Sequence, residues 1–148
     1  LKIAKEKGFN VQSFDLNSPV TLSEKYDVAF LSQILEHVDS PINLLRFVNG
    51  SLKKGSKVII SVPNELSIIH FKYPYFKEDG NHLYSFSITN MKELLIEAGF
   101  NLEKTYFDYY TSLTNKLKID RHLKFFDRFP VWFRYPFAWS FWFVGEKI

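Results

Sequence analysis

Glu36 and His37, which stand side by side, form the most chemically suggestive pair in this sequence. They come shortly after a compact apolar run, Tyr26 to Leu31, and Ser32 and Gln33 lie between the run and the pair. Because an imidazole titrates near neutral pH, His37 is a candidate general base that takes a proton from a substrate hydroxyl, with Glu36 beside it as a substrate contact. The alternative is a structural role, in which the pair orients its loop and caps the next helix.

A second set of candidate side chains lies between residues 65 and 86, in a stretch rich in aromatic residues and histidine. It contains His82 and Tyr84, preceded by His70, Tyr73 and Tyr75. These side chains could line a pocket for an acceptor molecule. A histidine within an aromatic cluster more often serves packing than catalysis, so packing is the alternative.

Apolar strand-like runs and amphipathic helices alternate along the chain and would position these side chains. The expected elements are helices over 1–7, 41–50 and 88–98 and strands over 10–15, 26–31, 57–62, 100–109 and 137–147. This alternation favours an α/β domain with a mostly parallel sheet and helices on both faces. Open parallel sheets bind ligands beyond the carboxyl ends of their strands. The strand ends at Asp15, Ser32 and Asn64 should therefore share one rim.

The composition describes one ordinary globular domain over residues 1–148. Of the 148 residues, 46% are hydrophobic and 24% charged, and the absence of cysteine excludes disulfides and thiolate metal sites. No apolar run reaches the roughly 18 residues of a membrane-spanning helix, so we expect a cytoplasmic protein. The net charge of +3 does not favour nucleic-acid binding.

An aromatic and basic insertion is expected over 111–135, before the last strand. Within 113–134, six basic residues and two acidic ones leave a local charge of +4, and phenylalanine and tryptophan are interleaved with them. The insertion could be a packed lid over the acceptor or a subunit interface in a homodimer. A basic amphipathic stretch can also lie on an anionic membrane, which would make the protein membrane-peripheral.

Several segments, taken in their order and spacing, resemble one enzyme family. They are Leu35-Glu36-His37-Val38 after one strand, Pro63-Asn64 after the next, the helix exit Ala98-Gly99-Phe100, and the closing Phe143-Val144-Gly145-Glu146-Lys147. The set resembles the class I S-adenosylmethionine-dependent methyltransferases, especially small-molecule enzymes related to the ubiquinone-biosynthesis O-methyltransferases. This resemblance implies a Rossmann-like doubly wound sheet with an antiparallel last strand. It also implies that the chain is the C-terminal portion of such a domain, whose glycine-rich cofactor loop would precede Leu1.

The resemblance further implies S-adenosylmethionine as the cofactor. Asp15 would accept a hydrogen bond from the adenine amino group, with the Leu16 backbone near the ring. Ser32 and Gln33 would line the methionine end and the reacting methyl group, where positioning is the main catalytic contribution. The alternatives are that Asp15 only forms a turn and that Ser32 and Gln33 form an ordinary loop.

For the acceptor, the resemblance implies His37 as the catalytic base and Glu36, Asn64, His82 and Tyr84 as substrate contacts. No metal site is expected, although in some relatives the Glu-His pair is thought to touch a divalent metal ion. The expected reaction is methyl transfer to an oxygen of a small-molecule, lipid-linked or sugar-linked acceptor. This fragment alone is expected to be inactive. The alternative function is that of a truncated or degenerate module that binds a partner without catalysis.

Overall fold

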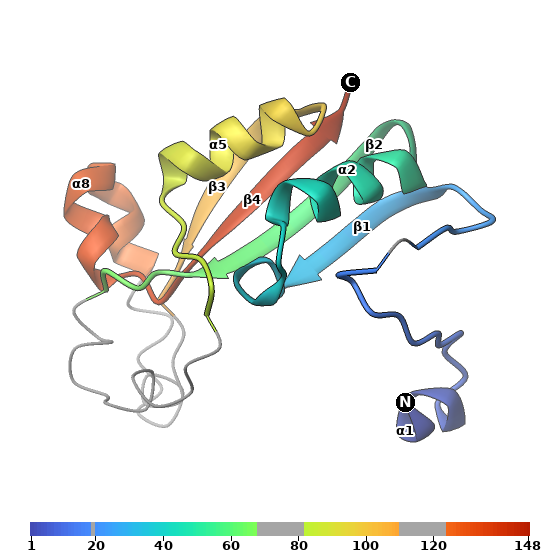
Figure 1. Cartoon of the computed structure of the whole chain (residues 1–148). Helices are drawn as coiled ribbons and strands as arrows, with labels where there is room; N and C mark the ends of the chain where they lie inside the picture. The colour runs from blue at the N-terminus through green and yellow to red at the C-terminus, as the bar shows by residue number, and fades with distance from the viewer. Residues whose placement is uncertain (19, 68–81, 110–123) are drawn as a thin grey trace.

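The computed structural model describes residues 1–18, 20–67, 82–109 and 124–148. Within these residues, one four-stranded sheet has the order β1-β2-β4-β3 (Figure 1). The strands are β1 (Tyr26–Ser32), β2 (Leu52–Pro63), β3 (Phe100–Asp108) and β4 (Ser140–Lys147). β1 pairs parallel with β2, whereas β4 lies antiparallel to both β2 and β3, so three strands share one direction. The mostly parallel sheet with an antiparallel last strand is therefore confirmed.

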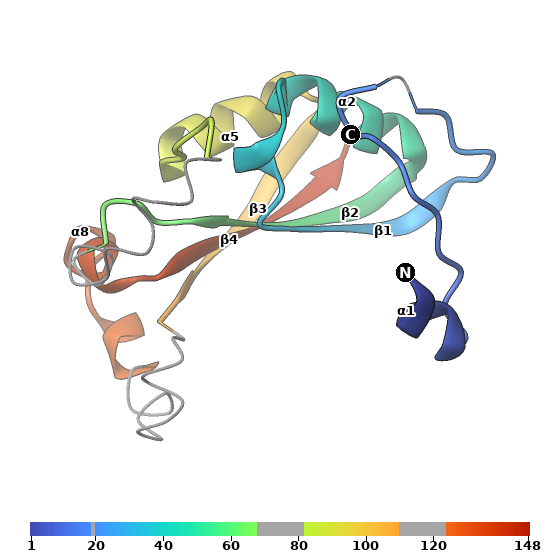
Figure 2. The same cartoon turned by 60° about the horizontal axis from the view of Figure 1, so that its bottom comes forward.

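Two helices, α2 (Pro41–Ser51) and α5 (Ile88–Glu97), lie together on one face of the sheet (Figure 2). α2 connects β1 to β2, as a parallel pair requires. Ser87 caps the N-terminus of α5: its Oγ accepts the Asn90 N–H at 3.1 Å while the Asn90 side chain accepts the Ser87 N–H at 2.7 Å. The other face of the sheet leaves Val28, Phe30 and Tyr106 exposed. In the described ranges, the expected helices therefore cover one face only.

The core lies between this helix pair and the sheet. Alternate residues of β2 and β4 point into it from the sheet, and the helices contribute Leu45, Met91 and Leu95. The strand contribution comes from Val58, Ile60, Val62, Phe141 and Phe143, all fully buried. Burial of each such side chain stabilises the fold by about 1.5–3 kcal/mol. This packing holds the strands in place, and with them the polar residues at the strand ends.

The segment before β1 differs from the sequence prediction. α1 (Lys2–Glu6) confirms the expected first helix, but residues 10–15 form no strand. A strand needs a neighbour for its backbone hydrogen bonds, and none of the described strands pairs with this segment. Instead, the Asp15 carboxylate accepts the Asn17 N–H at 3.0 Å and the Ser18 hydroxyl at 2.8 Å, which closes a turn.

The described part of the 111–135 insertion consists of short helical turns. They are η2 (Lys124–Arg128), α8 (Val131–Arg134) and η3 (Tyr135–Phe137), which leads into β4. Residues 111–123 lie outside the described ranges. Across the stretches that the structure covers, no helix has both the length and the apolar character needed to cross a membrane.

Candidate active site at the carboxyl edge of the sheet

The ends of β1 and β2 meet side by side at Ser32 and Ser61. Their hydroxyl oxygens lie 3.1 Å apart, and the Gln33 side chain donates to the Ser61 hydroxyl at 3.2 Å. Gln33 has a φ of +53°, a left-handed conformation that costs a non-glycine residue about 1 kcal/mol or more. The chain therefore turns sharply after β1, with Ser32 and Gln33 exposed on the rim. Ser61 was not among the predicted site residues, although a serine inside the apolar run of β2 is a visible signal.

Glu36 is a buried carboxylate in the short helix η1 (Leu35–His37) that follows this turn. Its side chain is 0% exposed, and within the described chain neither carboxylate oxygen accepts a hydrogen bond. Burial raises the pKa of Glu36, and the backbone of Glu36 and the nearby histidines oppose that rise only in part. A buried carboxylate without a partner is unfavourable for folding, and such groups concentrate at functional sites.

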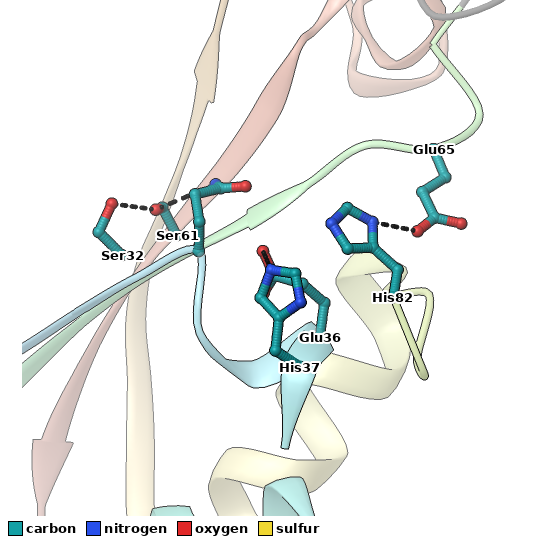
Figure 3. A network of polar contacts seen from close by, with 7 residues as sticks. Ser32, Glu36, His37, Ser61, Glu65 and His82 are labelled. Carbon is teal, nitrogen blue, oxygen red and sulfur yellow. Dashed lines mark hydrogen bonds and ion pairs between the residues drawn. The ribbon is translucent and has the colours of Figure 1, made fainter. Parts of the chain in front are cut away.

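His82 joins Glu36 and His37 from a distant part of the sequence. The Leu83 N–H donates to the Glu36 carbonyl oxygen at 2.7 Å, which holds the 82–83 segment against η1. The two imidazole rings lie edge to face with centroids 4.8 Å apart, and His37 Nε2 lies 3.9 Å from Glu36 Oε1 (Figure 3). The structure thus brings together three of the predicted residues, one carboxylate and two imidazoles.

Glu65, which follows the end of β2, holds His82 from the other side. Its Oε1 lies 3.2 Å from His82 Nδ1, and its Oε2 accepts the Ser85 hydroxyl at 2.5 Å. This contact favours a proton on Nδ1 and directs the other ring nitrogen toward His37 and Glu36 (Figure 3). Glu65 was not predicted either; its position two residues after a strand end is the signal that the sequence offers.

Glu36, His37 and His82 could also hold a divalent metal ion. Each offers one ligand atom, and these atoms lie within 4.8 Å of one another. A carboxylate with two imidazoles is a common donor set for Zn²⁺ and other first-row metals. The residues fit such an ion, because a cation would compensate the buried Glu36 carboxylate, which accepts no hydrogen bond in the described chain, and because Glu65 orients His82 as outer-shell carboxylates do.

Two predicted substrate contacts, Asn64 and Tyr84, are engaged in structural hydrogen bonds. Asn64 is 1% exposed, and its side-chain amide donates to the carbonyl oxygens of Tyr135 at 2.7 Å and Ala138 at 2.9 Å. The Tyr84 hydroxyl donates to the Asp39 carbonyl oxygen at 2.7 Å. Asn64 therefore anchors the segment before β4, and Tyr84 anchors the 82–85 segment to the start of α2. Contact of either residue with a substrate stays a prediction.

Asp15 and Leu16 lie on the turn that precedes β1, near the start of α2. The Asn17 side chain accepts the Asp39 N–H at 2.9 Å, which fixes this turn. Hydrogen bonds from the Asn17 N–H and from Ser18 lower the pKa of Asp15, so its carboxylate already serves the turn. Leu16 lines a cavity of about 290 Å³ between this segment and α2.

Comparisons with known proteins agree with this fold. The sequence pattern of the methyltransferase domain family matches residues 1–105. An S-adenosylmethionine-dependent methyltransferase from Thermotoga maritima superposes with a TM-score of 0.67 at 18% identity, over 99% of this chain and 68% of that one. An enzyme of the same description from Listeria monocytogenes gives 0.67 at 15% identity, over 99% and 74%. Among curated proteins, no sequence matches significantly.

The solved structures establish the fold and agree with the expected cofactor, but the fold does not fix the reaction. The [4+2]-cyclase SpnF also matches in shape, with a TM-score of 0.63 at 16% identity over 99% of this chain and 60% of its own. These comparisons confirm the resemblance to class I methyltransferases without singling out the ubiquinone-biosynthesis branch. The reaction therefore depends on the residues of the site.

Proposed function

Because the chain belongs to the methyltransferase domain family, we propose that it forms the acceptor side and part of the cofactor side of an S-adenosylmethionine-dependent methyltransferase. One observation carries this proposal: the buried Glu36 carboxylate, which accepts no hydrogen bond within the described residues, lies against His37 and His82 at the carboxyl edge of the sheet. That edge is where open α/β sheets bind their ligands. Titratable groups that converge there, with one pKa displaced by burial, support a reaction that moves a proton.

The acceptor atom in this proposal is a hydroxyl oxygen. S-adenosylmethionine supplies an electrophilic methyl group on sulfur, so an O–C bond forms as the S–C bond breaks. The side chains of this chain handle the hydroxyl proton: His37 Nε2 takes it, and the Glu36 carboxylate, 3.9 Å away, stabilises the resulting imidazolium. His82, held by Glu65, contacts the same acceptor from the opposite side.

The cofactor contacts in the proposal are those at the strand end and at the turn before β1. Ser32 and Gln33, exposed on the rim beside Ser61, line the methionine end. Asp15 and Leu16 lie by the adenine, next to the cavity along α2. The glycine-rich loop and the ribose-binding acidic residue would come from residues upstream in a longer protein. The two matched methyltransferases support this proposal, because the chain covers only 68% and 74% of their lengths.

Small-molecule, lipid-linked and sugar-linked alcohols are the acceptor classes that fit this chemistry. A neutral hydroxyl needs a base to accept its proton during methyl transfer, whereas a thiolate has already lost its proton. The presence of two histidines beside one carboxylate therefore favours a hydroxyl oxygen over a thiolate sulfur.

A metal-assisted form of the same reaction is the second candidate, favoured by the ligand distances at the site. In this form Glu36, His37 and His82 hold a divalent cation, which would polarise the acceptor hydroxyl as a Lewis acid. Glu65 would keep His82 in the orientation that ligation needs.

A calorimetric titration of the full-length protein with S-adenosylhomocysteine tests the cofactor assignment. We expect one binding site. A non-catalytic module would give no binding heat, and that result would end the proposal.

Transfer of a radiolabelled methyl group from S-adenosylmethionine to molecules in a cell extract tests the roles of the acceptor-site residues. His37→Ala and His82→Ala should each lower transfer by about 100-fold or more and keep the S-adenosylhomocysteine affinity. Asn101→Ala, an exposed change at the opposite edge, is the control. Loss of activity in a chelator would favour the metal-assisted form.

A further inference from the structure

Three large apolar side chains are exposed close together in the sequence of the C-terminal segment. Phe125 is 55% exposed, Val131 48% and Trp132 76%, the highest value among the large hydrophobic side chains in the described ranges. With Arg128, which is also exposed, they form what we call the Trp132 surface. A single exposed apolar residue is ordinary in a folded protein. Three exposed apolar residues within a stretch of eight, one of them a largely exposed tryptophan, indicate an interaction surface.

The exposed rings pack against a series of aromatic side chains that extends to the core. Ring centroids lie 5.3 Å apart between Phe125 and Phe129, 4.8 Å between Phe129 and Phe133, and 5.6 Å between Phe133 and Phe137. Trp132 packs edge to face on Phe133 at 6.0 Å. The outward position of Trp132 is therefore fixed by ordered packing of its neighbours.

The segment is also anchored at its base, at the end where it meets the sheet. The buried Asn64 amide donates to the carbonyl oxygens of Tyr135 and Ala138, and the Asn64 N–H donates to that of Trp139. Asn64 directly follows β2, so the Trp132 surface lies at the carboxyl end of β2 (Figure 1). This is the end of the sheet that carries the candidate active site.

The charged residues around the Trp132 surface indicate what kind of partner it binds. Within 124–134 there are three basic residues and one acidic residue. Asp127 is paired with Arg134 Nη1 at 3.2 Å, and the Arg134 guanidinium lies 4.3 Å from the Phe107 ring centroid, turned toward the body of the protein. The Arg128 guanidinium, by contrast, lies 5.7 Å from the ring centroid of the exposed Phe125. The exposed Arg128 cation thus lies beside one of the exposed aromatic rings.

We propose that the Trp132 surface docks the protein on a membrane of anionic phospholipids. Tryptophan and phenylalanine insert at the level of the headgroups, where the ring is in contact with acyl chains and the indole N–H with water. A neighbouring arginine gains from the negative surface potential of anionic lipids. Docking of this kind is peripheral, with the apolar side chains buried at the boundary between headgroups and acyl chains. It is independent of the proposed methyl transfer, although it would place the site near a lipid-linked acceptor.

Flotation of the full-length protein with lipid vesicles tests this proposal. We expect binding to phosphatidylcholine vesicles that contain phosphatidylglycerol, weaker binding in high salt, and little binding to phosphatidylcholine alone. Trp132→Ala and Phe125→Ala should each weaken vesicle binding by about ten-fold, and Arg128→Ala by about five-fold. Phe9→Ala removes an aromatic ring that is 65% exposed elsewhere and should leave binding unchanged.

Two further measurements keep the result interpretable. The thermal midpoint of each variant establishes that it is folded, because the altered side chains are exposed in the folded protein. Trp132→Phe should retain binding but lose the fluorescence change that vesicles cause in the wild type. Equal binding to neutral and anionic vesicles, no binding at all, or variants that float like the wild type would overturn the proposal. Self-association that is lost in Trp132→Ala would also overturn it, since the surface would then be an interface between copies of this chain.

Discussion

Replacement of Glu36 by glutamine should stabilise the metal-free protein at neutral pH. The side chain is fully buried, neither oxygen accepts a hydrogen bond in the described part of the chain, and burial raises the pKa of Glu36. Glutamine keeps the shape of the side chain and removes its charge. A gain in stability would indicate that the carboxylate is kept for function, since natural proteins tolerate such costs at active sites.

An unsatisfied buried charge costs more than an unsatisfied neutral amide, and we expect this difference to be about 1–3 kcal/mol at neutral pH. For a chain of 148 residues this corresponds to a rise in the thermal midpoint of roughly 3–9 °C. The raised pKa also gives a pH signature. Between the unfolded-state pKa near 4.5 and the higher folded-state value, only the folded protein holds the proton. The free energy of unfolding of the wild type therefore falls as the pH rises through this window, and this contribution should be absent from Glu36→Gln.

Scanning calorimetry in a chelating buffer, from about pH 4 to about pH 7, measures both effects. The two proteins should be nearly equal at the acid end and differ most at the neutral end. Glu97→Gln is the matched control, because the Glu97 side chain is 68% exposed and its ion pair with Arg46 lies at the surface. A Glu36→Gln protein that is less stable than the wild type at neutral pH would refute the reasoning, since the carboxylate would then have stabilising partners.

Three smaller predictions concern the elements around the site. Ser87→Ala should lower the free energy of unfolding in urea by about 1 kcal/mol, because the hydroxyl that accepts the Asn90 N–H is lost; no change would contradict the cap. Gly99→Ala should cost about 1 kcal/mol or more, since φ is +84° and the new Cβ would lie 3.1 Å from Asn49 Nδ2; a gain in stability would contradict that geometry. Burial, together with the nearby Asp127, raises the pKa of Tyr109 to about 12, so the free energy of unfolding should fall as the pH rises from 10.0 to that value. An ultraviolet titration that detects ionisation of every tyrosine near its ordinary pKa would contradict the burial of Tyr109.

The sequence was sufficient to predict the features that depend on local patterns. Strands such as β1 and β2 show as short apolar runs, although only β2 is largely buried, and the adjacent Glu36 and His37 are visible without any structure. The strand expected over 10–15 was wrong, because alternating polarity is only one requirement. A strand also needs a neighbour, and residues 10–15 have none among the described strands.

The contacts between distant segments could not be predicted in the same way. His82 reaches Glu36 through a backbone hydrogen bond from Leu83, which no periodicity reveals. Glu65 matters because it touches His82, and that contact exists only in three dimensions. Asn64 was placed correctly at a strand end, but its side chain points inward to the segment before β4. The direction of a side chain after a strand depends on how the following backbone turns, which the residue type does not determine.

A crystal structure of the full-length protein with bound S-adenosylhomocysteine tests the central claim most directly. We expect the ligand beyond the ends of β1 and β2, beside Ser32 and Gln33, with its sulfur directed toward the space between His37 and His82. Binding at another edge of the sheet, or a sulfur turned away from the two histidines, would contradict the assignment of this rim as the site of methyl transfer.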